Sequence, residues 1–139
     1  MRYTYVQTQS LALHWVTVLQ VVIDTEGHDL PVLRGMRRAL ERKQVRQIEF
    51  EYSRYGSWGN RGAQSTLEYA LTWLKGHGYF CYWLLPAGGL LPASPPCWRG
   101  RAFEIRRWSN LRCAHEPPVI ELLQQAARRQ HRMRAHAVN

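Results

Sequence analysis

The chain has 139 residues, of which 45% are hydrophobic and 21% charged, and this composition is typical of a folded domain rather than of a disordered segment. The net charge is +9, carried mainly by arginine, but charge alone predicts a nucleic-acid partner poorly and no recognition motif accompanies it. The three cysteines have neither the number nor the spacing of a disulfide framework or a zinc site.

The first apolar run, residues 11–23, contains a histidine and a glutamine and leads directly into Asp24. It is too short to span a bilayer, and it lacks the small-residue cleavage site of a signal peptide. We therefore expect a soluble protein with no membrane span, and the cytoplasm is the favoured compartment.

Strand and helix signals alternate through the middle of the chain. Residues 18–23 are apolar and β-branched, as in strands buried on both faces. A helix should follow, with Asp29 as its cap and leucines along one face, and residues 45–52 form the next strand. A second helix should begin at a capping box made by Ser65 and Glu68.

The remaining elements are expected to close the sheet. Residues 79–85 form an aromatic strand whose rings we interpret as core, and residues 86–100 form a loop. Residues 101–107 alternate as a strand, which should pair with 79–85 in a long-looped hairpin and place one antiparallel strand at the sheet edge. A basic helix should follow from residue 119. The fold class is therefore α/β, with parallel strands, crossover helices and a closing antiparallel hairpin.

Acidic residues follow the first two predicted strands. Asp24 and Glu26 lie just beyond the first strand, and Glu49 and Glu51 lie in or at the end of the second. Ligands of open α/β sheets bind beyond the carboxyl ends of the strands, and an acid in an apolar strand tends to mark a cleft. These acids are candidate ligand contacts, with His28 as a candidate base. The alternative is that Asp24 and Glu26 only favour the N-terminus of the following helix.

Several common site motifs are absent from the sequence. It contains no dinucleotide-binding G-x-G-x-x-G after a strand, no G-x-x-x-x-G-K-[ST] phosphate loop and no G-x-S-x-G nucleophile elbow. The sequence therefore indicates neither a nucleotide-binding cradle of these types nor a serine hydrolase.

Residues 22–35, VIDTEGHDLPVLRG, carry a more specific pattern. This segment resembles the K-I-D-v-E-G-h-E-l-x-V-L-x-G signature of FkbM-family methyltransferases, with Val22 in place of the usual Lys and Asp29 in place of the usual Glu. Later segments, including residues 108–113, fit the same family, so that the resemblance covers about residues 18 to 113.

The resemblance implies a Rossmann-like methyltransferase sheet, S-adenosylmethionine as the cofactor, and methyl transfer to the hydroxyl oxygen of a small molecule or glycan. It also implies roles for individual residues. Asp24, Glu26 and Gly27 would bind the cofactor, and His28 and Glu51 would be the catalytic bases.

In that family the first three strands of the sheet carry the glycine loop and the acidic residue that hold the cofactor. We expect this chain to start just before the fourth strand, with a lead-in (1–17), a partial FkbM-like methyltransferase domain (18–116) and a basic C-terminal helix or tail (117–139). The first strands would then be missing, and the isolated chain would be inactive. Two alternatives stay open: a noncatalytic remnant or interaction module that associates through an exposed sheet edge, and a basic nucleic-acid-binding protein.

Overall fold

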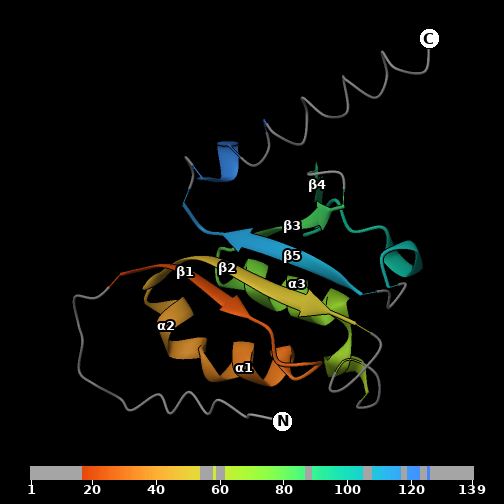
Figure 1. The fold of residues 1–139 in the computed structure, drawn as a ribbon, viewed down its shortest axis with the longest axis horizontal. Coiled ribbons are helices and arrows are strands. Elements are labelled where there is room, and N and C mark those ends of the chain that lie inside the picture. The colour runs from red at the N-terminus through yellow and green to blue at the C-terminus, as the bar shows by residue number, and fades with distance from the viewer. Residues whose placement is uncertain are drawn as a thin grey trace.

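The computed structural model describes residues 17–53, 58, 62–86, 89–104, 108–116, 119–122 and 125. Figure 1 shows the arrangement of the strands and helices in this part of the chain. In chain order they are β1 (Val18–Ile23), α1 (Asp29–Gly35), α2 (Arg37–Glu41), β2 (Val45–Tyr52), α3 (Leu67–Gly76), β3 (Phe80–Leu85), β4 (Gly89–Pro92) and β5 (Ser109–Ala114). Two 3₁₀ helices, η2 (Ala63–Ser65) and η3 (Gly100–Ala102), lie in the connections.

The five strands form one sheet in the order β1-β2-β5-β3-β4. Strands β1 and β2 are parallel and are connected through α1 and α2. Strand β5 is antiparallel to both of its neighbours, β2 and β3, so β3 runs in the same direction as β1 and β2. Strand β4 turns back on β3 and forms the far edge. The predicted α/β class is therefore confirmed.

The antiparallel strand lies later in the chain, and deeper in the sheet, than the sequence analysis predicted. Residues 100–102 form η3 instead of the start of a strand, and residues 105–107 lie outside the described part of the chain. The strand begins at Ser109 and is inserted between β2 and β3, whereas the edge is formed by β4 from within the expected loop. The alternation in 101–107 is misleading because Glu104 bonds to the start of α3 rather than continuing a strand.

Helices α1, α2 and α3 lie on one face of the sheet (Figure 1). Because side chains alternate along a strand, Ile48, Phe50 and Tyr52 of β2 point to this face, where they are fully buried. The helices contribute Leu30, Leu33, Leu40, Leu67, Leu71 and Leu74 to the same core. The rings of Tyr79 and Trp83 are also buried, which confirms that the aromatic strand belongs to the core.

The start of α3 differs from the predicted capping box. Ser65 belongs to η2, and Thr66 is the N-cap, whose hydroxyl accepts a hydrogen bond from the Tyr69 amide at 3.1 Å. The expected helix after β1 is likewise interrupted at Met36, which separates α1 from α2. The helices after β1 and β2 are therefore where the sequence analysis placed them, but their ends depend on contacts that the local pattern does not encode.

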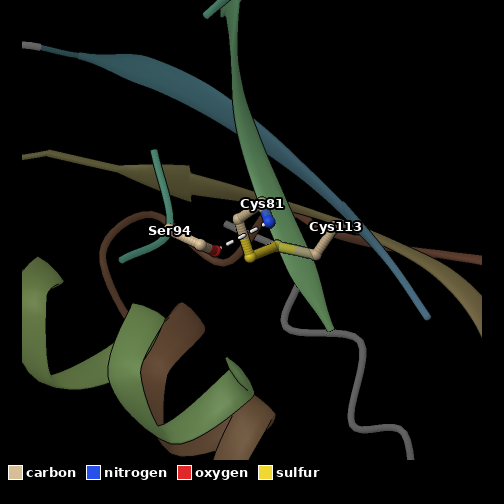
Figure 2. The surroundings of a disulfide bond; sticks show 3 residues. All are labelled: Cys81, Ser94 and Cys113. Carbon is tan, nitrogen blue, oxygen red and sulfur yellow. Dashed lines mark hydrogen bonds between the residues drawn. A yellow bond between two sulfur atoms is a disulfide. The ribbon is translucent and has the colours of Figure 1, made fainter. Parts of the chain in front are cut away.

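Cys81 and Cys113 form a disulfide bond between β3 and β5 (Figure 2). The two residues are directly paired in the sheet, with Cα atoms 4.0 Å apart, and both are buried. The Cys81 amide also donates a hydrogen bond to the Ser94 hydroxyl, at 2.9 Å. The sequence analysis, which argued against a disulfide framework, did not predict this single bond, because it is the insertion of β5 beside β3 that brings together residues 32 positions apart. Cys97 is a free, exposed thiol.

The two ends of the chain are described only in part. Residues 119–122 are helical, in agreement with the start of the expected basic helix, and most of the remainder of 117–139 lies outside the described residues, as do residues 1–16 of the lead-in. In the portion of the chain covered by the structure, no helix has the length and apolar character needed to cross a membrane.

Candidate functional site

The loop after β1 and the end of β2 lie at the same edge of the sheet. Ile23 pairs with Phe50 in the parallel register, so Asp24 and Glu51 follow at the same level beyond this pair. The carboxyl edge of parallel strands is where open α/β sheets bind their ligands. The structure thus brings the five residues that the resemblance singled out to one edge: Asp24, Glu26, Gly27, His28 and Glu51.

A tight turn connects β1 to α1. The His28 amide donates a hydrogen bond to the Thr25 carbonyl at 3.1 Å. Glu26 and Gly27 have φ values of 52° and 89°, in the left-handed region. Glycine adopts this region freely, whereas a residue with a Cβ such as glutamate is disfavoured there by about 1–2 kcal/mol. Backbone strain of this kind is often found at functional sites, and the Glu26 side chain is exposed.

Asp29 is fully buried and does not cap α1, in contrast to the sequence prediction. Its Oδ1 atom accepts a hydrogen bond from the Glu51 amide at 3.2 Å, so the side chain joins the loop after β1 to the end of β2. Its Oδ2 atom and the Thr25 hydroxyl are both buried and make no hydrogen bond of standard geometry.

The pKa of Asp29 is raised because burial disfavours the charged carboxylate. The Glu51 carboxylate contributes to the rise through charge repulsion. The amides of Glu51 and Asp29, and the nearby Thr25 hydroxyl, act in the opposite direction. Asp29 is therefore a buried residue that supports the site, whereas the two acids of the loop, Asp24 and Glu26, are exposed to solvent.

Glu49 and Glu51, the two acids of β2, have different surroundings. Glu49 accepts hydrogen bonds from Nη2 of Arg112 at 2.7 Å and from Nε at 3.3 Å, and its side chain is 17% exposed. It is thus the acidic partner of an ion pair on the sheet face opposite the helices. Glu51 lies at the end of the strand beside Asp29. Only Glu51 belongs to the candidate site.

Glu104 fixes the connection that leads into β5. Its Oε1 atom accepts hydrogen bonds from the Tyr52 hydroxyl and the Leu67 amide, both at 2.9 Å. Its Oε2 atom accepts from the Glu68 amide at 3.3 Å. A carboxylate is favourable at a helix N-terminus because the first amides of the helix have no partner within the helix. Glu104 thereby ties the end of β2, the start of α3 and the approach to β5 to one another.

Trp108 is a residue of this edge that the sequence analysis did not identify as a site residue. It is 77% exposed, the highest value among the exposed large hydrophobic side chains of the described residues. The next residue, Ser109, pairs with Tyr52 at the end of β2, so Trp108 lies beyond the carboxyl end of that strand. No local signal distinguishes it from the buried Trp58, since its position depends on where β5 enters the sheet.

The site offers polar side chains of several kinds, but no metal centre can be assigned to it. Among the described residues, no group of three or more His, Cys, Asp and Glu side chains is arranged to hold a metal ion.

The comparison with known families agrees with the resemblance seen in residues 22–35. The family model of the methyltransferase FkbM domain matches residues 2–81, more than half of the chain. The matched range contains β1, the turn after it, and β2 with Glu51. No curated protein and no solved structure matches the chain. The chain therefore belongs to the FkbM methyltransferase family.

Proposed function

We propose that this chain takes part in methyl transfer from S-adenosylmethionine to a hydroxyl oxygen. Membership of the FkbM family supports methyltransferase activity, and the resemblance supports this donor and an oxygen acceptor. The observation that carries the proposal is the gathering of Asp24, Glu26, Gly27, His28 and Glu51 at the carboxyl edge of β1 and β2.

The turn after β1 has groups that suit a polar donor. The carboxylates of Asp24 and Glu26 are exposed and can accept hydrogen bonds from hydroxyl or amino groups. Gly27 has no Cβ, and its positive φ suits glycine, so this buried residue forms the tight turn that presents the two carboxylates. We assign binding of S-adenosylmethionine to these three residues.

When bound, S-adenosylmethionine supplies an electrophilic methyl group, and transfer of this group to a hydroxyl oxygen releases the hydroxyl proton. His28 and Glu51 are the candidate bases for that proton. The proton passes to the His28 imidazole or the Glu51 carboxylate as the new oxygen–carbon bond forms and the sulfur–carbon bond breaks. The Asp29 side chain holds the backbone of Glu51, and so acts as a positioning residue.

The acceptor is a small-molecule or glycan hydroxyl in this proposal. The exposed indole of Trp108 supports such an acceptor, because a flat apolar surface at the edge of the sheet where Glu51 lies suits a ring that carries hydroxyl groups. Replacement of Trp108 by Ala is expected to weaken acceptor binding while leaving donor binding intact.

The resemblance places the glycine loop and the acid that hold the cofactor on strands that precede the equivalent of β1. The proposal therefore includes a contribution from such strands, supplied by polypeptide outside the described residues. Donor binding is therefore expected to need those strands as well as the residues at the carboxyl edge of β1 and β2.

The test is calorimetric titration of S-adenosylmethionine into the folded chain, alone and co-expressed with the N-terminal half of another FkbM-family protein. Binding is expected in the combined sample and should weaken with Asp24→Asn and Glu26→Gln. Glu41→Gln is the matched control, because it removes an exposed carboxylate from α2, before the opposite end of β2. If neither sample binds the donor although both are folded, the proposal is wrong.

Transfer to the acceptor is tested separately with a radiolabelled methyl group. His28→Asn and Glu51→Gln should slow transfer, by about 10²–10⁴-fold for the residue that acts as the base, and should leave donor binding unchanged. Equal loss of donor binding and transfer in both variants would instead place these residues in the donor site.

A second candidate function, association with another chain, is favoured by the exposed edge of β1. Nucleic-acid binding has less support, because Arg37, Arg46 and Arg112 form ion pairs with acidic residues of the chain itself.

A further inference from the structure

Strand β1 forms one edge of the sheet, and its outer side has no partner strand among the described residues. The Val18 amide donates to the Gln44 carbonyl at 2.7 Å, so Val18 directs its backbone groups toward β2. The direction of backbone hydrogen bonding alternates along a strand. Leu19, Val21 and Ile23 therefore turn their amides and carbonyls toward the free edge.

Side chains of β1 are also exposed to an unusual extent. Val18, Leu19 and Val22 are 38%, 67% and 64% exposed, and the strand sequence VLQVVI contains neither a charge nor a proline. Proteins usually protect sheet edges with charged residues, prolines or short strands. The opposite edge follows this rule, since β4 has four residues and ends at Pro92. Of the two sheet edges in the described part of the chain, the β1 edge alone combines outward-facing backbone groups, length and apolar side chains.

We propose that β1 pairs with β1 of a second copy of this chain, antiparallel and about a two-fold axis through Gln20, to form one continuous sheet. In this register Val18 lies opposite Val22 of the second copy, and Leu19 lies opposite Val21. The backbone groups that Leu19 and Val21 direct to the free edge then face each other. The Gln20 side chains meet at the axis. Each donates to Oε2 of Glu49 in its own chain at 3.5 Å, and its amide oxygen and second N–H can still bond to the other copy.

Neighbouring registers fit less well. A shift by one residue would set the outward backbone groups of Leu19 against those of Val22, which point to β2. A shift by two residues would place Asp24 opposite Val18 and Gln20 opposite Val22. The register about Gln20 pairs aliphatic with aliphatic side chains. It also keeps charged residues out of the strand pair, so the repulsion expected between two copies of net charge +9 does not act within the paired strands.

This inference goes beyond the proposed methyl transfer and does not depend on it. The dimer forms only when no other strand is paired with the outer edge of β1. Its first test is sedimentation equilibrium of the full 139-residue chain and of the variants Leu19→Lys and Val22→Lys. Dimers are expected, with the dissociation constant raised by about tenfold or more in both variants. Val32→Lys is the matched control, because Val32 is a valine of 36% exposure on α1, away from the edge.

Cross-linking tests the register. In a Cys97→Ser background, which removes the exposed free thiol, Gln20→Cys is expected to form a covalent dimer on mild oxidation. In this register Gln20 occupies a non-hydrogen-bonded pair, whose Cα atoms would be about 4.5 Å apart, within the range that a disulfide spans. Val32→Cys should stay monomeric on a denaturing gel. A chain that is monomeric at every concentration would overturn the proposal, as would a dimer that survives Val22→Lys and is not linked by Gln20→Cys. If the lysine variants fail to fold, the cross-linking result decides.

Discussion

The Asp29 carboxylate accepts a hydrogen bond from the Glu51 amide, and this contact joins two segments that are neighbours only in the folded sheet. The loop that Asp29 follows carries the proposed donor-binding residues, and Glu51 is a proposed base. A single buried side chain thus supports both parts of the candidate site. Its Oδ2 atom, like the Thr25 hydroxyl, is buried and makes no hydrogen bond of standard geometry.

Two substitutions at Asp29 should have different effects. Asp29→Ala leaves the Glu51 amide without its partner and is expected to lower the free energy of unfolding by about 1–3 kcal/mol. Asp29→Asn keeps an oxygen acceptor and removes the buried charge, so stability at neutral pH should be unchanged or higher. Urea unfolding of the two variants provides the measurement, and equal losses in both would contradict it.

The pH dependence of stability should also change in Asp29→Asn. Because the pKa of Asp29 is raised above 3.8, the folded state holds its proton more tightly than the unfolded state does. The contribution of Asp29 to stability is therefore present below pH 3.8 and is lost as pH rises through its folded pKa. The Asn variant should lack this loss, which is checked by unfolding curves measured across that range.

Glu104 is expected to matter more for stability than Glu68, although the sequence analysis placed Glu68, with Ser65, in a capping box. Glu104→Ala removes the acceptor of the Tyr52 hydroxyl and of the Leu67 and Glu68 amides, and should cost about 1.5–3 kcal/mol. Glu68→Ala, in the same first turn of α3, should change stability by less than half as much. Thermal and urea unfolding of both variants show which carboxylate stabilises the start of α3. A larger effect of Glu68→Ala would support the capping box instead.

The disulfide predicts one reactive thiol in the unreduced, denatured chain. Cys97 should react with a thiol reagent, whereas Cys81 and Cys113 should react only after reduction. Replacement of both paired cysteines by Ala should lower the free energy of unfolding by about 3–4 kcal/mol, given a closed loop of this length. Cys97→Ser is the control and should have little effect. Three reactive thiols before reduction would disprove the bond.

His115 should make the protein less stable in mild acid. Its pKa is lowered from 6.5, chiefly by burial and further by Lys43 and Arg46, with Glu116 acting in the opposite direction. Its Nε2 atom is buried without a hydrogen-bond partner, and its ring contacts Tyr79. The unfolded state therefore takes up the proton more readily, and this part of the stability is lost as pH falls below 6.5 toward the folded pKa. His115→Phe keeps a ring beside Tyr79 and should make stability depend less on pH in this range. If the stability of the variant and of the unmodified protein fell equally with pH, His115 would not be the residue responsible.

Strands β1 and β2 agree residue for residue with the predicted segments 18–23 and 45–52. Both are apolar or alternating runs that end in polar residues, so their boundaries depend on local chemistry that a sequence displays directly. The placement of Asp24 and Glu51 at one edge follows from two parallel strands lying side by side. For this reason the acidic edge could be predicted, together with the family to which its pattern belongs.

The position of β5, the disulfide and the partners of Asp29 and Glu104 could not be predicted in the same way. Each joins residues more than 20 positions apart, and the choice among possible partners is made by packing and by the need to satisfy buried backbone groups across the whole sheet. A carboxylate that reaches a distant amide has the same local sequence as one that caps its own helix. Short-range periodicity therefore determined which segments are strands and helices, whereas the order of the strands decided which side chains meet.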